Sequence, residues 1–418
     1  MVVFKIIIFC FLLILPFRAY GIDFRFPMAN TYPFGIKPGC VSQEEMNQDC
    51  VKAFEDFIRN SVTSEGCPAG VEYRVHIGEG IAFSGSEPYD TYSEGIAWGM
   101  LLCAIMDNGS NNARAYFDGF NKYRKAYRNS NGLMSWHIGS DATIKASGIA
   151  VEADENMAMA LMLAHQKWGS NAEQNYMNEA REIMKALMDH CIQAPELFMN
   201  PGDTWGGYDL VHPCNFDVCF YKEWEQFTGE PRWINVKNES YNILHKVYSK
   251  YPTGYLPHWC DHEGNPTTGK NEYFSDYTFE FDALQTAFKI PLDYLLNGDQ
   301  THSLAFSIPN SLSNSIKKST NSNVNNICSG YKLDGEVANH STGNSAFIGA
   351  FGVASMVSSD HQTWCDSLYL SLRNQKTGGK WGYYKDIIRL YTLIIMSGNY
   401  PYSNVVRSQG SKTMEVRL

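Results

Sequence analysis

The chain has 418 residues and a formal net charge of -10, with 44% hydrophobic and 19% charged residues. This composition indicates a folded globular protein with enough apolar residues for a large core. The net charge is negative and the chain has no dense run of Lys or Arg, so we expect neither nucleic acid nor an anionic membrane surface as a partner. Aromatic residues make up 14% of the chain, more than a core alone requires, and aromatic faces also bind uncharged sugars.

The first 21 residues have the pattern of a secretory signal peptide. Lys5 supplies a short basic region, residues 6–16 are apolar, and Ala19 and Gly21 are small residues at a cleavage position. The apolar run is too short for a stable membrane span, although an uncleaved anchor is the alternative interpretation. We therefore predict a secreted, extracellular protein that has no contact with a membrane after cleavage. Residues 22–418 are predicted to form a single domain and to act as a monomer.

Cysteine usage agrees with an oxidising compartment. Eleven cysteines include Cys10 inside the predicted signal, which leaves an even number in the rest of the chain. No pair has the CxxC spacing of a zinc or redox site, so several disulfide bonds are predicted. Buried free thiols are the alternative, especially for Cys103, which lies in an apolar run.

Taken in chain order, the pattern is that of consecutive helices. Ser42 and Glu45 form a capping box that opens a helix through residue 60. Helical spacing of apolar residues or a continuous apolar run then predicts helices over 94–106, 113–127, 157–168, 176–187, 232–249, 281–295, 344–357 and 384–397. The Asn- and Ser-rich residues 310–326 are predicted to form an exposed loop.

These about ten to twelve helices come mostly in pairs, with little of the period-two alternation that strands require. The simplest architecture is an all-α toroid of paired helices. A helical solenoid is the alternative, but no fixed sequence period of the solenoid kind is present.

Carboxylates lie at the predicted starts of three of these helices. Ser93 is a candidate N-cap, which would place Glu94 in the first turn of its helix. Glu152 and Asp154 precede the helix over 157–168, and Asp282 opens the helix over 281–295. If alternate helices of a toroid run parallel, these acids converge on one cleft. Glycosidic hydrolysis with inversion needs such a pair, an acid and a base about 6.5–9.5 Å apart with a water between them.

The electrostatics of a helix start set a condition on this hypothesis. A helix N-terminus lowers a carboxyl pKa, which suits a base and opposes an acid. Glu94 would therefore need apolar burial or a neighbouring carboxylate, such as Glu152, to keep its proton near neutral pH. Ordinary capping by three separate acids is the alternative, and the residue pattern alone leaves both open.

Several segments, taken together and in order, resemble glycoside hydrolase family 8. The segments are Tyr-Ser-Glu-Gly-Ile-Ala-Trp-Gly-Met-Leu-Leu at 92–102, Gly-Leu-Met-Ser-Trp-His at 132–137, and residues 153–170, 256–261, 281–283, 292–294 and 397–399. The resemblance covers nearly all of the chain after the predicted signal. It implies an (α/α)6 barrel and inverting endo-hydrolysis of β-1,4-linked polysaccharide, with no cofactor.

The resemblance also implies roles for individual residues. Glu94 matches the general acid, and Asp282 matches the general base. Glu152 falls where the family has an Asp that holds the sugar at the cleavage point. The predicted substrate-binding residues are Trp136 and Trp205, as stacking platforms, together with Asp154, Tyr277 and Gln285. No metal is predicted, because the eleven histidines are scattered without paired ligand spacing.

Three departures from the family pattern concern the site. Glu152 is one methylene longer than the family's Asp, and a shift of about an ångström in a positioning group can cost a large factor in rate. Gln285 stands where the family usually has Arg; an amide can form hydrogen bonds but carries no charge. Residues 212–216, His-Pro-Cys-Asn-Phe, only loosely match the family's Asn-Pro-Ser-Tyr-Phe.

The first hypothesis is therefore a secreted endo-1,4-β-glucanase that hydrolyses cellulose-like β-glucan. A second keeps the mechanism but changes the polymer to chitosan or xylan. A third is a glycan-binding protein whose site has been weakened at Glu152 and Gln285.

Overall fold

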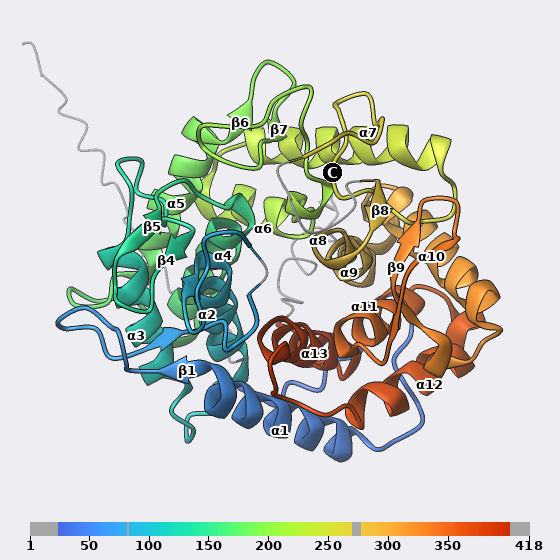
Figure 1. Ribbon diagram of the computed structural model, residues 1–418, viewed down its shortest axis with the longest axis horizontal. Helices are drawn as coiled ribbons and strands as arrows, with labels where there is room; N and C mark the ends of the chain where they lie inside the picture. The colour runs from blue at the N-terminus through green and yellow to red at the C-terminus, as the bar shows by residue number, and fades with distance from the viewer. Residues whose placement is uncertain (1–23, 82, 270–276, 402–418) are drawn as a thin grey trace, which may run out of the picture.

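The computed structural model describes residues 24–81, 83–269 and 277–401. Within these residues the chain forms thirteen α-helices, and twelve of them, all but the single turn α8 (Phe281–Leu284), build an (α/α)6 barrel (Figure 1). Inner and outer helices alternate along the sequence around a central axis. The predicted toroid is thus confirmed, and in the described part of the chain no helix is long and apolar enough to cross a membrane.

The inner helices form the core, and two of them, α2 and α11, are apolar on nearly all sides. They are α2 (Ser93–Met106), α4 (Val151–Trp168), α6 (Phe220–Thr228), α9 (Thr286–Asn297), α11 (Ser345–Ser355) and α13 (Gly382–Met396). In α2 every residue except Glu94 is buried, because the helix packs against neighbours on every face. Glu94 is therefore the most accessible residue of this core helix.

The outer helices are amphipathic and shield the inner ring from solvent. They are α1 (Gln43–Ser61), α3 (Ala113–Ala126), α5 (Tyr176–His190), α7 (Arg232–Lys250), α10 (Leu304–Thr320) and α12 (Gln362–Arg373). The capping box predicted at Ser42 and Glu45 is present at the start of α1, with both hydrogen bonds formed.

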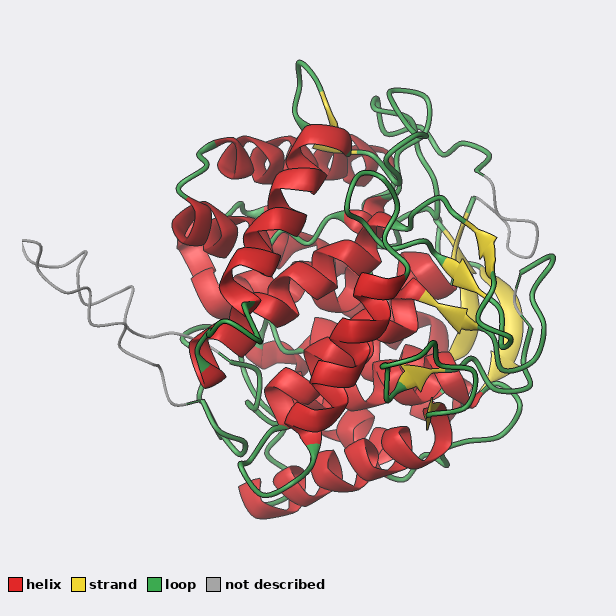
Figure 2. Ribbon diagram, turned by 90° about the vertical axis from the view of Figure 1, so that its left-hand side faces the viewer, coloured by secondary structure: helices red, strands yellow, loops and turns green. Residues whose placement is uncertain are grey.

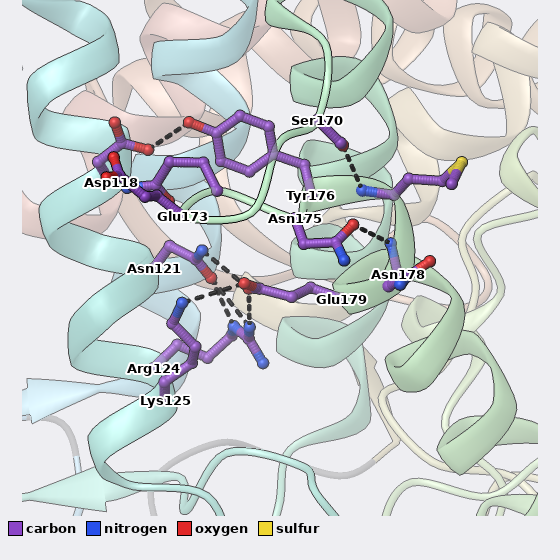
Figure 3. A network of polar contacts seen from close by, with 12 residues as sticks. Asp118, Asn121, Arg124, Lys125, Ser170, Glu173, Asn175, Tyr176, Asn178 and Glu179 are labelled. Atoms are coloured by element: carbon purple, nitrogen blue, oxygen red, sulfur yellow. Dashed lines mark hydrogen bonds and ion pairs between the residues drawn. The ribbon is translucent and has the colours of Figure 1, made fainter.

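Two outer helices, α3 and α5, are joined by a buried polar network (Figure 3). Arg124 Nη2 donates to Glu179 Oε2 at 2.8 Å, and Lys125 Nζ donates to Glu179 Oε1 at 3.0 Å. Asn121 donates to the same carboxylate at 2.9 Å and also accepts hydrogen bonds from Arg124. Every polar group of this contact thus has a partner, as a buried charge requires.

Short strands gather on one side of the helical barrel (Figure 2). One antiparallel sheet has the strand order β3 (Thr91–Tyr92), β4 (His137–Ile138) and β5 (Ile144–Ala146). A second antiparallel sheet has the order β10 (Val337–Thr342), β9 (Cys328–Lys332) and β8 (Thr278–Phe279). Strand β3 leads directly into α2, and β8 leads into the single-turn helix α8 (Phe281–Leu284). These two sheets therefore hold the starts of the helices that carry Glu94 and Asp282.

The remaining regular elements are short. Two-stranded pairs are β1 (Val62–Thr63) with β2 (Arg74–Val75) and β6 (Ile192–Gln193) with β7 (Phe198–Met199). The 3-10 helices are η1 (Pro213–Asn215), η2 (Gly298–Gln300), η3 (Val324–Asn326) and η4 (Ser359–His361).

Two local predictions are wrong. Residues 310–320 belong to helix α10, where Ile308, Leu312 and Ile316 recur every fourth residue and are buried, so tertiary packing overrides the polar composition. Ser93 is not an N-cap but the first helical residue, and Tyr92 at the cap makes no side-chain capping bond. The backbone amide of Ser93 donates instead to the carbonyl oxygen of Trp136 at 2.8 Å, since β3 pairs with β4 there.

The predicted disulfide bonds are absent from the described residues, where all ten cysteines are free thiols. Most are buried singly in different elements, for example Cys50 in α1, Cys103 in α2 and Cys365 in α12. There they act as small apolar side chains that fill the core, the usual role of a buried free cysteine. The predicted signal peptide at residues 1–21 lies outside the described residues.

Candidate active site

Glu94 is the second residue of α2, and its environment favours the protonated form of its carboxyl. Its Oε2 accepts a hydrogen bond from the Tyr383 hydroxyl of α13 at 3.0 Å. Burial, with the nearby charges of Glu152 and Asp282, raises the pKa of Glu94 well above its ordinary value. Both conditions that the sequence sets for an acid at a helix N-terminus are therefore met.

Asp282, on α8, has surroundings that favour its ionised form. Its side chain is 25% exposed, and His258 Nε2, fully buried, lies 3.0 Å from its Oδ2. Burial alone would raise the pKa of Asp282, but the hydrogen bond and charge of His258, with the charge of His212, lower it below its ordinary value. The surroundings of Asp282 thus favour ionisation, whereas those of Glu94 at the same site favour protonation.

Glu152 is the second residue of α4 and lies between these elements. Its Oε2 accepts hydrogen bonds from Gln285 Nε2 at 3.2 Å and from the Cys214 thiol at 3.4 Å. Burial raises the pKa of Glu152 to about 7 although the Lys289 ammonium opposes the rise. Gln285 is fully buried between α8 and α9, so it orients Glu152 through a hydrogen bond without adding charge.

Lys289, one turn after Gln285 on α9, supplies a buried positive charge near Asp217 and Glu152. Its Nζ donates to Asp217 Oδ2 at 2.8 Å and to the backbone oxygen of Cys214 at 2.7 Å. The second bond fixes η1, the turn that carries the Cys214 thiol to Glu152. Lys289 therefore has two effects: it holds this turn in place, and its positive charge lowers the pKa of Glu152.

The two predicted stacking platforms lie on loops beside these acids. Trp136 is half-buried, its ring centre lies 5.5 Å from that of Tyr92, and its carbonyl accepts the Ser93 amide next to Glu94. Trp205 is also half-buried, and its ring centre lies 5.8 Å from that of Trp259. Trp259 in turn stacks on His212 at 4.0 Å. One tryptophan thus lies on the side of Glu94 and the other on the side of Asp282.

The remaining predicted binding residues differ in placement. Tyr277 is 53% exposed, and its hydroxyl lies 3.0 Å from Thr268 Oγ1. Asp154 is buried, and its Oδ1 accepts the Met134 amide at 3.1 Å. Its carboxyl therefore supports the loop before Trp136, and a contact of Asp154 with a sugar stays a prediction. Burial also raises the pKa of Asp154 to about 7.

Sequence reasoning did not assign roles to Tyr383, His258 or Lys289. His258 lies inside the segment 256–261 that carries part of the family resemblance, but its role as the partner of Asp282 depends on the folded geometry. The role of Lys289 could have been predicted from the sequence, because a lysine in the apolar stretch 286–292 is expected to be buried and to pair with an acid. Tyr383 has none, since a tyrosine in an amphipathic helix is most often a packing residue.

A carboxyl whose pKa is raised by burial, close to a carboxyl whose pKa is lowered by a histidine, is an arrangement suited to acid–base cleavage of a glycosidic bond. On an (α/α)6 barrel, this pair places the protein in the class of glycoside hydrolases. The chain belongs to glycosyl hydrolases family 8, whose sequence profile matches residues 24–398.

Individual relatives agree with this assignment. The chain is 32% identical over 381 residues to Endoglucanase A of Acetivibrio thermocellus, which covers 90% of this chain and 74% of that protein. It is 32% identical over 391 residues to Beta-glucanase of Niallia circulans, with 90% of each chain covered. The structure of Beta-1,3-1,4-glucanase from Paenibacillus sp. X4 superposes with a TM-score of 0.82 at 30% identity, and the match covers 91% of this chain and 100% of that one.

Proposed function

We propose that this glycoside hydrolase is an inverting endo-β-glucanase that cleaves β-1,4 bonds of glucan chains. The observation that carries the proposal is the meeting of Glu94 and Asp282 at one site, with the Tyr383 hydroxyl bonded to the first and His258 to the second. Burial raises the pKa of Glu94, and the bond with His258 lowers that of Asp282. Glucan as the substrate is supported by the names of the similar proteins, an endoglucanase and two β-glucanases.

In the proposed mechanism, Glu94 donates its proton to the glycosidic oxygen as the bond to the anomeric carbon breaks. Asp282 accepts a proton from a water molecule, whose oxygen attacks the anomeric carbon from the opposite face. The product has inverted anomeric configuration, Glu94 is left ionised and Asp282 protonated. Exchange of one proton with solvent restores both groups for the next cycle.

Glu152 serves as the positioning carboxyl in this proposal. Gln285 and the Cys214 thiol hold its Oε2, which leaves the other oxygen to bond a sugar hydroxyl. Bonds from two neutral donors hold the longer Glu side chain in place without a charged partner. The extra methylene is therefore compatible with a defined carboxyl position, which supports an active enzyme over a glycan-binding protein.

The substrate test compares reducing-end release from carboxymethyl cellulose, mixed-linkage β-1,3-1,4-glucan, xylan and chitosan. We expect hydrolysis of the two glucans, with loss of about 10²–10⁴-fold in kcat for Glu94→Gln. Proton NMR of the first product formed tests inversion. Release that survives Glu94→Gln, or a product with retained configuration, would contradict the mechanism; hydrolysis of chitosan or xylan alone would contradict the substrate.

We further propose export of the protein, based on the basic, apolar and small-residue pattern of residues 1–21. Expression of the full chain in a secreting host, followed by N-terminal sequencing of protein in the medium, tests this proposal. The expected mature N-terminus is residue 22. Protein that stays in the cell with residues 1–21 attached would contradict it.

A further inference from the structure

Three potential metal ligands surround one point beside the proposed base. His212, at the cap of η1, His258, in the loop before β8, and Asp282, on α8, each direct one ligand atom toward the others, and these atoms all lie within 4.8 Å of one another. We propose that these three residues bind a divalent zinc ion, and that the bound ion reversibly inhibits the enzyme.

The geometry is close to that of a zinc site. Zinc binds imidazole nitrogen and carboxylate oxygen at about 2.0–2.2 Å, so ligand atoms around a tetrahedral ion lie about 3.4 Å apart. His258 Nε2 and Asp282 Oδ2 are already 3.0 Å apart, and only His212 must approach further. The separations of the His212 ligand atom from these two atoms are at most 4.8 Å, so they must shorten by up to about 1.4 Å to complete the set.

The surrounding residues support the two imidazoles as a pair of ligands. The His212 and His258 ring centres are 5.4 Å apart, and His212 stacks on Trp259 with an interplanar angle of 17°. This stacking restrains the orientation of the His212 ring. Because the Asp282 side chain is 25% exposed, an ion can reach the ligands, and a water can occupy the fourth position.

The chemistry of the donors selects the metal. Two imidazoles with one carboxylate favour zinc and its neighbours in the transition series, whereas magnesium and calcium require oxygen ligands. The Cys214 thiol lies 3.3 Å from His212 Nε2 and 3.4 Å from Nδ1, which adds a soft sulfur close to the ligands. We therefore expect zinc to bind and magnesium and calcium to leave the enzyme unaffected.

The effect on activity rests on the proposed function, but the binding does not. A zinc ion on Asp282 Oδ2 occupies the oxygen that would take the proton from water, so the metal-bound enzyme lacks its base. The enzyme is expected to be fully active after treatment with EDTA and at least tenfold less active in micromolar zinc. A second addition of EDTA should restore the rate.

Binding is measured directly with Zn²⁺ by calorimetry and with Co²⁺ by its visible absorption. The wild-type protein should bind one ion, and His212→Asn should bind it at least tenfold more weakly. The matched control is His190→Asn, since His190 is exposed at the end of α5 and distant from these ligands in the sequence. Asp282→Asn provides a second test if His212→Asn does not fold, because it removes a ligand oxygen on another element.

The outcomes separate the two proposals. No binding by the wild type, or equal binding by wild type, His212→Asn and Asp282→Asn, overturns the zinc site. Inhibition that persists in His212→Asn, relative to that variant's own metal-free rate, also overturns it. Absence of glucan hydrolysis in the EDTA-treated wild type would contradict the proposed function and leave a measured zinc affinity unaffected.

Discussion

Buried carboxyls occur in two regions of this barrel that balance charge in opposite ways. Between α3 and α5, burial disfavours ionised Glu179, but Arg124, Asn121 and Lys125 outweigh it and lower the Glu179 pKa below its ordinary value. At the active site, Glu94 and Glu152 share their surroundings with Asp282, and both have raised pKa values. The residue type is the same, but the number of positive partners differs.

This difference separates a structural network from a working site. A carboxylate with matched cations is fixed in one protonation state, which suits the joining of two helices. A carboxyl without a matched cation can hold and release a proton near neutral pH, at a cost in stability. The comparison predicts that substitutions in the two regions have opposite consequences for rate and for stability.

The largest expected effect is on catalysis. Asp282→Asn removes the proposed base and should lower kcat by about 10²–10⁴-fold, whereas Glu179→Gln should leave the kcat of folded enzyme unchanged. Reducing-end assays on mixed-linkage glucan, with circular dichroism to confirm folding, measure both. A Glu179→Gln enzyme with a similar loss of kcat would remove the distinction between the two regions.

The next effect is on stability. Arg124→Met leaves the buried Glu179 carboxylate with only half-exposed Lys125 as a cation, so the free energy of unfolding should fall by about 3 kcal/mol. Lys125→Met should lower it by less than about 1 kcal/mol, because that ion pair is partly solvated. Urea unfolding at neutral pH measures both; equal losses would show that burial of Arg124 contributes nothing specific.

A smaller effect of opposite sign is expected at Glu94. Its pKa is raised in the folded state, so folding binds a proton, and stability falls as pH rises above the ordinary value near 4.5. Glu94→Gln removes this dependence. It should stabilise the protein by about 1 kcal/mol or more at pH 7 and have little effect at pH 4, where both forms are neutral. Urea unfolding midpoints of wild type and Glu94→Gln at the two pH values measure this change in stability. A variant less stable than wild type at pH 7 would contradict the prediction.

The smallest effect concerns the pH profile. The rate should rise as Asp282 loses its proton at low pH and fall as Glu94 loses its own at higher pH. The Tyr383 hydroxyl lowers the Glu94 pKa through its hydrogen bond, so Tyr383→Phe should move the alkaline limb of kcat/KM to higher pH by up to about one unit. An unchanged limb would show that another group controls it.

Much of the fold follows from local sequence pattern. Apolar residues at helical spacing and the capping box at Ser42 predict paired helices, since these signals depend on neighbours within one or two turns. The same local reasoning fails at residues 310–320, because the helix there is stabilised by burial of Ile308, Leu312 and Ile316 against other elements. It also fails for the cysteines, whose pairing depends on distances that spacing does not encode.

By itself, the sequence placed Glu94, Glu152 and Asp282 at the N-terminal ends of predicted helices, because each precedes or opens an apolar run. In the structure Glu94 and Glu152 lie in the first turns of α2 and α4, and the helix predicted over 281–295 is divided, with Asp282 on the single turn α8 before α9. Only the tertiary structure decided which of them holds a proton. Protonation depends on burial and on Tyr383, His258 and Lys289, which come from other elements and meet the acids only in the folded barrel. Side chains distant in sequence set the local electrostatics, so the chemistry of the site is a property of the assembled barrel.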